Sequence, residues 1–234
     1  GSLINYNTSS GVPYDNGTVI IKSGTVNATG GKYGCGIGSG GNSYRNLFQP
    51  GKMNAGSGGT IRIEGGTVNA TGNGGAAGIG GGFSLYGKGG QGGNIIISGG
   101  TVNVTVTGGG AGIGGGSTGI TSKTDLRGGL AGNYLQTGGK VTVHSEDGAG
   151  IGSAAYCNDK RGDDNRVQIS GGSVTVTSTG KGAGIGGGYA GWMPDVWLTS
   201  NDNVSAGTAV VKCTAVDGAG IGGGMEMHSL GDLN

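Results

Sequence analysis

The chain contains little of what most globular folds use. Of its 234 residues, only 3 are proline and 3 are cysteine, 5% are aromatic and 12% are charged. The 14 Lys and Arg and 13 Asp and Glu leave a net charge of +1, which gives no electrostatic basis for binding nucleic acid or an acidic membrane surface. The longest runs of Ile and Val are three residues, too short to cross a bilayer. We therefore expect no nucleic-acid partner and no membrane insertion.

The three cysteines do not form a pattern typical of a disulfide framework or a metal site, because no Cys-x-x-Cys or Cys/His pair at ligand spacing occurs. Cys35 stands where five other copies of a repeat have Ala77, Ala111, Ala149, Ala183 and Ala219. This indicates a small buried side chain. Cys213 falls in a strand-like run and Cys157 in a loop. We expect three thiols, with Cys35 unreactive until the protein unfolds.

Glycine supplies 64 residues, but the chain is neither collagen-like nor a flexible linker. Glycine does not recur strictly at every third residue, and the glycines alternate with a regular set of Ile, Val and Ala that can form a core. The phrase Gly-Ala-Gly-Ile-Gly-Gly-Gly recurs with variations in six copies. Its isoleucines are Ile37, Ile79, Ile113, Ile151, Ile185 and Ile221.

Each phrase follows two short segments of alternating apolar residues, such as Ile61-Arg62-Ile63 and Val68-Asn69-Ala70. Period-two alternation with β-branched residues predicts half-buried strands. Three strands per copy, separated by glycine corners, predict a right-handed parallel β-helix of about six coils, in which the isoleucines stack as one buried column. Glycine is expected at corners that need positive φ and where one wall lies close to the others.

Copies four and six depart from this pattern. Tyr134 and Gln136 take inward positions in copy four, and the interval before Ile151 is one residue shorter than in the other copies. In copy six the interval from Thr208 to Ile221 is one residue longer, and both differences are compatible with bulges. The first strand of copy six is either the segment with Asp202 and Val204 or Val196-Trp197-Leu198 followed by an insertion. We expect the solenoid over 18–224, with caps or tails at 1–17 and 225–234. Gly1-Ser2 is typical of a cloning remnant, so the chain is expected to be part of a longer protein.

Several chemical motifs are weak in this context. Gly110-Ala111-Gly112-Ile113-Gly114-Gly115 matches a dinucleotide fingerprint, but the match recurs through the repeat, and no P-loop lysine is present. Aspartate does not recur as calcium-binding nonapeptides require. We therefore expect no resident cofactor, apart from a calcium ion that Asp159, Asp163 and Asp164 could hold.

Eight of the twelve aromatic residues fall in the variable loops after the isoleucine phrases, where a solenoid often binds ligands. They are Tyr44, Phe48, Phe83, Tyr86, Tyr156, Tyr189, Trp192 and Trp197. Rings there can stack on sugars or fold back as lids over a thin core. In the ligand-binding interpretation, Trp192 and Trp197 are the rings on which a sugar stacks, and Asp195 or Asn201 accepts hydrogen bonds from its hydroxyl groups. The surface is extended by Tyr44, Phe83, Tyr86, Tyr156 and Tyr189.

Other features support weaker interpretations. Late carboxylates, including Asp195 and Asp202, could form the acid and base of a polysaccharide-active enzyme. No His, Lys or Arg is expected on a strand beside them, so we do not expect an enzyme. The outward Thr and Asn of the second strands could form an ice-binding face. Arg161-Gly162-Asp163 spells an integrin tripeptide, and the sequons at Asn27, Asn69 and Asn103 follow from the alternation.

The phrases Ile-x-Ile-x-Gly-Gly-Thr-Val-x-Ala-Thr and Gly-Ala-Gly-Ile-Gly-Gly-Gly resemble glycine-rich repeat regions of large surface proteins of gut Gram-positive bacteria. Those regions are often described as carbohydrate-binding. Over about 18–224 the resemblance implies an extracellular or cell-surface module that binds a glycan or a host glycoconjugate, or mediates adhesion, and is monomeric in isolation. The alternatives are a structural spacer without a ligand, a polysaccharide-active enzyme and, last, an ice-binding protein.

Overall fold

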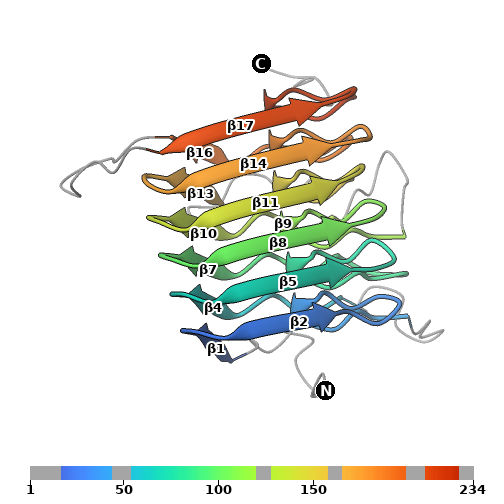
Figure 1. Cartoon of the computed structure of the whole chain (residues 1–234). Coiled ribbons are helices and arrows are strands. Elements are labelled where there is room, and N and C mark those ends of the chain that lie inside the picture. Colours follow the sequence, from blue (N-terminus) through green and yellow to red (C-terminus); the bar gives the residue numbers. More distant parts are fainter. Residues whose placement is uncertain (1–16, 44–53, 120–127, 158–164, 199–208, 227–234) are drawn as a thin grey trace.

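The computed structural model describes residues 17–43, 54–119, 128–157, 165–198 and 209–226. These residues form three parallel sheets of six strands each, and every coil of the chain adds one strand to each sheet (Figure 1). In Figure 1 the front strands run from left to right while the coils rise from the N-terminus to the C-terminus, which is a right-handed winding. The chain is therefore a right-handed parallel β-solenoid with three strands per coil, as its alternation predicted.

The first strands of the coils form sheet A. They are β1 (Thr18–Ile21), β4 (Thr60–Ile63), β7 (Asn94–Ile97), β10 (Asn133–Gln136), β13 (Arg166–Ile169) and β16 (Asp195–Trp197). The second strands form sheet B: β2 (Thr25–Thr29), β5 (Thr67–Gly72), β8 (Thr101–Val106), β11 (Lys140–Ser145), β14 (Ser173–Ser178) and β17 (Val210–Ala215). Sheet C contains the short strands β3 (Ile37–Gly38), β6 (Ile79–Gly80), β9 (Ile113–Gly114), β12 (Ile151–Gly152), β15 (Ile185–Gly186) and β18 (Ile221–Gly222).

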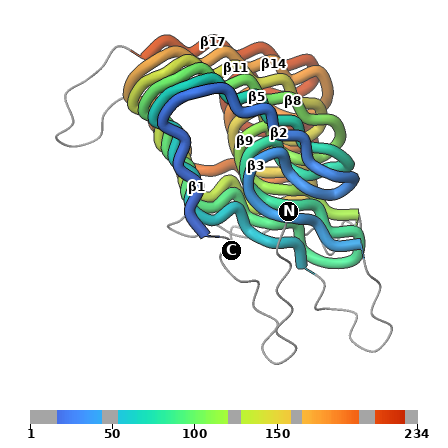
Figure 2. The backbone as a smooth tube through the Cα atoms, turned by 60° about the horizontal axis from the view of Figure 1, so that its bottom comes forward, coloured from blue at the N-terminus to red at the C-terminus, as the bar shows by residue number. Residues whose placement is uncertain are grey.

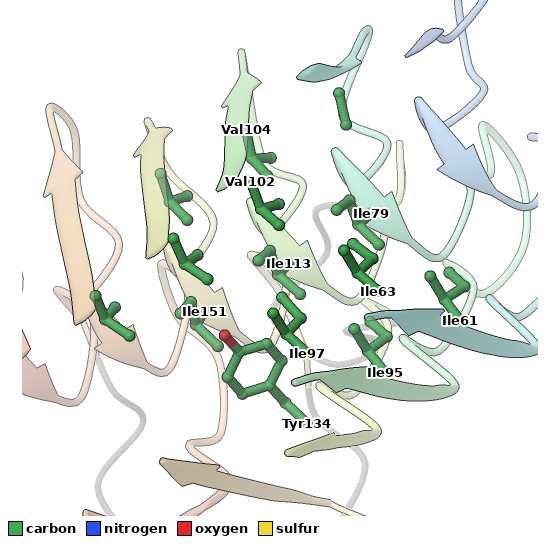
Figure 3. Packing of buried hydrophobic residues seen from close by; sticks show 14 of the residues in the cluster. Ile61, Ile63, Ile79, Ile95, Ile97, Val102, Val104, Ile113, Tyr134 and Ile151 are labelled. Atoms are coloured by element: carbon green, nitrogen blue, oxygen red, sulfur yellow. The ribbon is translucent and has the colours of Figure 1, made fainter. Parts of the chain in front are cut away.

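The core lies between the three sheets, where inward Ile and Val side chains of successive coils stack on one another (Figure 3). The predicted column is in register throughout, and Ile37, Ile79, Ile113, Ile151 and Ile185 are buried. The prediction was wrong for Ile221, which is 44% exposed. β18 is the edge strand of sheet C, so this side chain stacks on a column neighbour, Ile185, on one side only.

Glycine allows the walls of the solenoid to approach each other. A Cβ on Gly112 would lie 2.2 Å from Cγ1 of Val143 and 2.5 Å from the carbonyl oxygen of Gly150. Gly114 has φ +138°, and a Cβ there would lie 2.0 Å from the carbonyl oxygen of Gly152. All three contacts are far closer than van der Waals distance, so a side chain is excluded at these two positions.

The fourth coil keeps its register without a bulge. β10 pairs residue for residue with β7 and β13. Tyr134 and Gln136 both point inward, and the buried Tyr134 hydroxyl donates to Oε1 of Gln136 at 2.7 Å. The fourth coil is one residue shorter than its neighbours in the turn after β11. There Oε2 of Glu146 accepts a hydrogen bond from the backbone N–H of Gly108 at 2.6 Å. The internal hydrogen bond explains how two polar residues replace apolar ones in the core.

The sixth coil follows the second of the two sequence alternatives. β16 contains Val196 and Trp197, whereas Asp202 and Val204 lie outside the described residues. β17 pairs Val210 with Ser173, so its register begins at Val210 and not at Thr208. The interval from this first position to Ile221 is then 11 residues, the same as from Lys140 to Ile151 in the fourth coil. The prediction of a longer interval in the sixth coil was therefore wrong, because it placed the start of the strand at Thr208.

After each sheet C strand the backbone leaves the core toward a loop and returns to begin the next coil (Figure 2). Outgoing and returning segments alternate in one chain of backbone hydrogen bonds. Its members, each bonded to the next, are Gly40, Gly56, Gly82, Gly90, Gly116, Gly129 and Ala154. We call this row the glycine neck. A Cβ on Gly90 would lie 1.8 Å from the Gly56 carbonyl oxygen, so a side chain is excluded at this position of the neck.

Candidate functional site

Trp197 and Asp195 lie on a strand of sheet A. Val196 packs against the core, so its neighbours on β16 point outward. Trp197 is 41% exposed. The structure thus places the two side chains on the flat outer face of the solenoid instead of on a loop, as the strand alternative for copy six implied.

Parallel pairing sets two further polar residues beside them. Arg166 pairs with Asp195, and Gln168 pairs with Trp197, in adjacent strands about 4.8 Å apart. Arg166 is exposed and Gln168 is half-buried. The sequence reasoning expected no basic residue on a strand beside a late carboxylate, and Arg166 corrects it. These four residues form one surface, which we call the Trp197 face.

The Trp197 face combines an accessible indole with a guanidinium, a carboxylate and an amide. The indole offers a broad apolar surface, and the three planar groups offer both donors and acceptors. One positive and one negative charge balance each other in this set. The arrangement can hold a ligand that has an apolar face and hydroxyl groups at its edge.

A second group of candidates meets at the loops of the fourth to sixth coils. The N–H of Tyr156 donates to the carbonyl oxygen of Tyr189 at 2.8 Å, and the N–H of Trp192 donates to that of Cys157 at 2.8 Å. The rings of Tyr156 and Tyr189 meet edge to face, with centroids 5.2 Å apart and an interplanar angle of 75°. Backbone pairing between adjacent coils therefore brings three predicted residues together.

Charged side chains surround this ring pair. The ammonium of Lys181 lies 4.3 Å from the centroid of Tyr189. The Tyr189 hydroxyl donates a hydrogen bond to Oε2 of Glu226 at 2.8 Å. Oδ1 of Asp147 accepts a hydrogen bond from the backbone N–H of Lys181 at 3.1 Å. We call Asp147, Tyr156, Lys181, Tyr189 and Glu226 the C-terminal corner.

The tyrosines of the C-terminal corner hold their protons firmly. The hydrogen bond to Glu226, with a smaller contribution from burial, raises the pKa of Tyr189 to about 12. Burial raises the pKa of Tyr156, and the charges of Asp147 and Glu226 raise it further. Both rings are therefore neutral phenols at physiological pH.

The backbone of the C-terminal corner is strained. Tyr156, Ala190 and Glu226 have φ values of 59°, 47° and 55°, in the region that favours glycine. Each is the fifth residue after its column isoleucine. In a protein with glycine at most of its positive-φ positions, keeping Tyr and Glu side chains here is a local cost of the kind that clusters at functional sites.

Other aromatic candidates have different environments. Phe83 is buried, stacks on Tyr33 with centroids 5.1 Å apart, and covers a small cluster with Cys35, Ala76 and Ala77. It serves as a lid, which was the alternative to ligand binding. Tyr86 is 38% exposed. Tyr44 and Asn201 lie outside the described residues.

Asp159, Asp163 and Asp164 and the Arg161-Gly162-Asp163 tripeptide also fall outside the described ranges. Within those ranges, no group of three His, Cys, Asp or Glu side chains is placed to hold a metal ion. None of the described segments forms a helix long and apolar enough to cross a membrane. The three cysteines form no disulfide, as expected, and Cys35 is buried.

The outer face of sheet B carries the predicted ordered rows. Nδ2 of Asn69 donates to Oδ1 of Asn27 at 2.7 Å, and Nδ2 of Asn103 donates to Oδ1 of Asn69 at 2.9 Å. The row continues with Thr142, Thr175 and Lys212. The amides thus hydrogen-bond to one another along the solenoid axis in the first three coils.

The sequence reasoning missed Arg166 and Gln168 at the Trp197 face, and Asp147, Lys181 and Glu226 at the C-terminal corner. Arg166 could have been found by aligning Val196 with Val167, which sets Asp195 beside it. No sequence signal marks Lys181 or Glu226, because their contacts depend on the turns at Tyr156 and Ala190.

Comparison with known proteins supports the architecture alone. A model described as a β-helix repeat matches residues 19–41, 61–83, 95–117 and 167–189. These segments belong to the first, second, third and fifth coils, and the two unmatched coils are those with the shorter interval before the column isoleucine. No curated protein and no solved structure matched the chain.

Proposed function

We propose that the protein is an extracellular glycan-binding or adhesion module of a bacterial surface protein, and that the Trp197 face is its binding surface. The observation that carries the proposal is an indole 41% exposed on a flat β-face, with Arg166, Gln168 and Asp195 around it. Burying a large ring stabilises a fold, whereas leaving one on an open sheet contributes little to stability.

The chemistry of the face fits a sugar. One side of a pyranose ring presents C–H groups that stack on an indole, and its hydroxyls lie at the edge, where the guanidinium, amide and carboxylate can donate and accept hydrogen bonds. Because the charges of Arg166 and Asp195 balance, the face favours neutral sugars. The resemblance to repeat regions of bacterial surface proteins supports an extracellular location.

The test is a glycan array followed by calorimetric titration of the best ligand. Trp197→Ala is expected to abolish binding and leave the melting temperature nearly unchanged, because the side chain points away from the core. Ile20→Ala is the matched control, since Ile20 occupies the same outward row at the other end of sheet A and is 51% exposed. It should leave binding intact.

Two outcomes would count against the proposal. A loss of several degrees of stability in Trp197→Ala would show that the ring covers the fold, as Phe83 does, and would favour a structural spacer. An absence of binding by the wild-type protein across a broad array, with and without calcium, would remove the glycan hypothesis.

A further inference from the structure

The C-terminal corner has the components of a site for a positively charged ligand. Two neutral phenol rings meet edge to face, and the carboxylates of Asp147 and Glu226 raise the pKa of Tyr156 through their charge. Aromatic faces attract cations, and perpendicular rings with nearby carboxylates are the groups that recognise ammonium ions in proteins. None of these features is required by the Trp197 face.

The structure already contains a cation on this surface. The Lys181 ammonium lies 4.3 Å from the Tyr189 centroid, well inside the range of a cation–π contact. The Tyr189 hydroxyl donates a hydrogen bond to Glu226, which increases the electron density of the ring and strengthens its attraction for a cation. The internal lysine shows which charge the ring accepts.

The backbone supports a role beyond stability. Tyr156 and Glu226 occupy positive-φ positions where glycine would avoid strain. Their side chains are the ones that give the corner its second ring and its hydrogen-bonded carboxylate. Glycine would form these turns without the strain, so the cost is associated with keeping the two side chains and their contacts at this corner.

We propose that the C-terminal corner binds an organic ammonium group on the rings of Tyr156 and Tyr189, and that Lys181 occupies this position in the absence of the ligand. The ligand chemistry is a quaternary or methylated ammonium, which is weakly hydrated and is held by aromatic faces. Such a group occurs on choline and on methylated lysine side chains. Binding displaces the Lys181 ammonium toward solvent.

The experiment titrates tetramethylammonium chloride into the protein at constant ionic strength, with tyrosine fluorescence and calorimetry as readouts and sodium chloride as the blank. Removing the competing lysine by Lys181→Met is expected to tighten binding about two- to five-fold, the equivalent of an exposed cation–π contact. Lys212→Met, which removes a lysine from the outer face of sheet B, is the matched control and should leave the affinity unchanged.

Tyr189→Leu, in the Lys181→Met background, should abolish binding. If that variant fails to fold, Glu226→Gln keeps both rings and should weaken binding measurably. Choline and a trimethyl-lysine peptide, tested separately, identify the source of the ammonium, and saturable binding of either supports the proposal. The inference is overturned if Lys181→Met does not bind tetramethylammonium saturably, or binds it no more tightly than the wild type. Trp197→Ala should not alter this binding, which separates the outcome from that of the glycan test.

Discussion

The first three coils and the last three differ at one position of the repeat, the fifth residue after the column isoleucine. In the first half this position is Asn42, Ser84 and Thr118, which continue as a parallel row of isolated bridges. In the second half it is Tyr156, Ala190 and Glu226, all with positive φ. The same repeat thus supports two loop geometries, and the strained one coincides with the aromatic and charged residues.

The core and the loops are therefore specified by different residues of the repeat. Sheets A, B and C keep the same register through both halves. In the first half, Asn42, Ser84 and Thr118 pair between coils through backbone hydrogen bonds, whereas in the second half the turns place Tyr156 and Glu226 at positive φ. Variation in the second half therefore supplies aromatic and charged side chains without altering the stacked strands.

The largest expected effect distinguishes the middle of the column from its end. Ile113→Ala should lower the free energy of unfolding by about 2 to 5 kcal/mol, because a buried side chain leaves a cavity. Ile221→Ala should cost less than about 1 kcal/mol, since this side chain is 44% exposed. Urea denaturation of both variants measures the two losses in the free energy of unfolding. Equal losses would contradict the one-sided stacking of the last coil.

At alkaline pH, one ionisable side chain from each half should contribute to a loss of stability. Burial raises the pKa of Cys35 from 9.0 to about 12, and the hydrogen bond to Glu226 raises that of Tyr189 from 10.0 to about 12. Each folded pKa lies above the unfolded one, so the folded protein retains protons that the unfolded chain has lost. Stability should therefore be constant below about pH 9 and decline toward pH 12.

Cys35→Ala should reduce the part of this decline that begins near pH 9, to which Cys213 also contributes. Tyr189→Phe should reduce the part that begins near pH 10, to which Tyr134 and Tyr156 also contribute. Denaturation midpoints at a series of alkaline pH values measure both. In the same samples at neutral pH, a thiol reagent should label Cys35 only after unfolding, and the half-buried Cys213 sooner. An unchanged pH profile for Cys35→Ala would contradict the assignment.

The sequence predicted most of this architecture and little of the second half's chemistry. Alternation placed the strands, and the alignment of Cys35 with the repeat alanines predicted its burial. The pairing of Arg166 with Asp195 required the register of the sixth coil, which the sequence left open between two segments. The positive φ of Tyr156 could not be predicted, because most positive-φ positions in this chain carry glycine.

A third prediction tests the two loop geometries directly. Ala190→Gly should raise the free energy of unfolding by up to about 1 kcal/mol, because glycine adopts positive φ without strain. Thr118→Gly, at the equivalent position of the first half, should lower it by about 1 kcal/mol, since Oγ1 of Thr118 donates to the carbonyl oxygen of Gly87 at 2.8 Å. Thermal denaturation measures both, and changes of the same sign would show that the two geometries are not distinct.

The smallest expected effect concerns the outer face of sheet B. Asn69→Ala removes two side-chain hydrogen bonds of the amide row and should cost about 0.5 to 1 kcal/mol. Thr175→Ala, in the same row of the second half, should change stability by less than about 0.5 kcal/mol, as substitutions on an outer surface usually do. A cost at Asn69 no greater than at Thr175 would show that the amide row does not stabilise the sheet.

The glycine neck has a consequence for how such a protein can change. Backbone hydrogen bonds at the neck join the outgoing and returning segments. The two ends of each loop are therefore held at fixed positions, whatever the length of the chain between them. The segments beyond it already differ in length, with 7 residues at 83–89, 12 at 117–128 and 15 at 41–55, and loop closure costs rise only slowly with length. We therefore expect the loops to be exchangeable, and a foreign peptide grafted between Gly119 and Gly128, which leaves the paired Thr118 in place, should be displayed without loss of the scaffold.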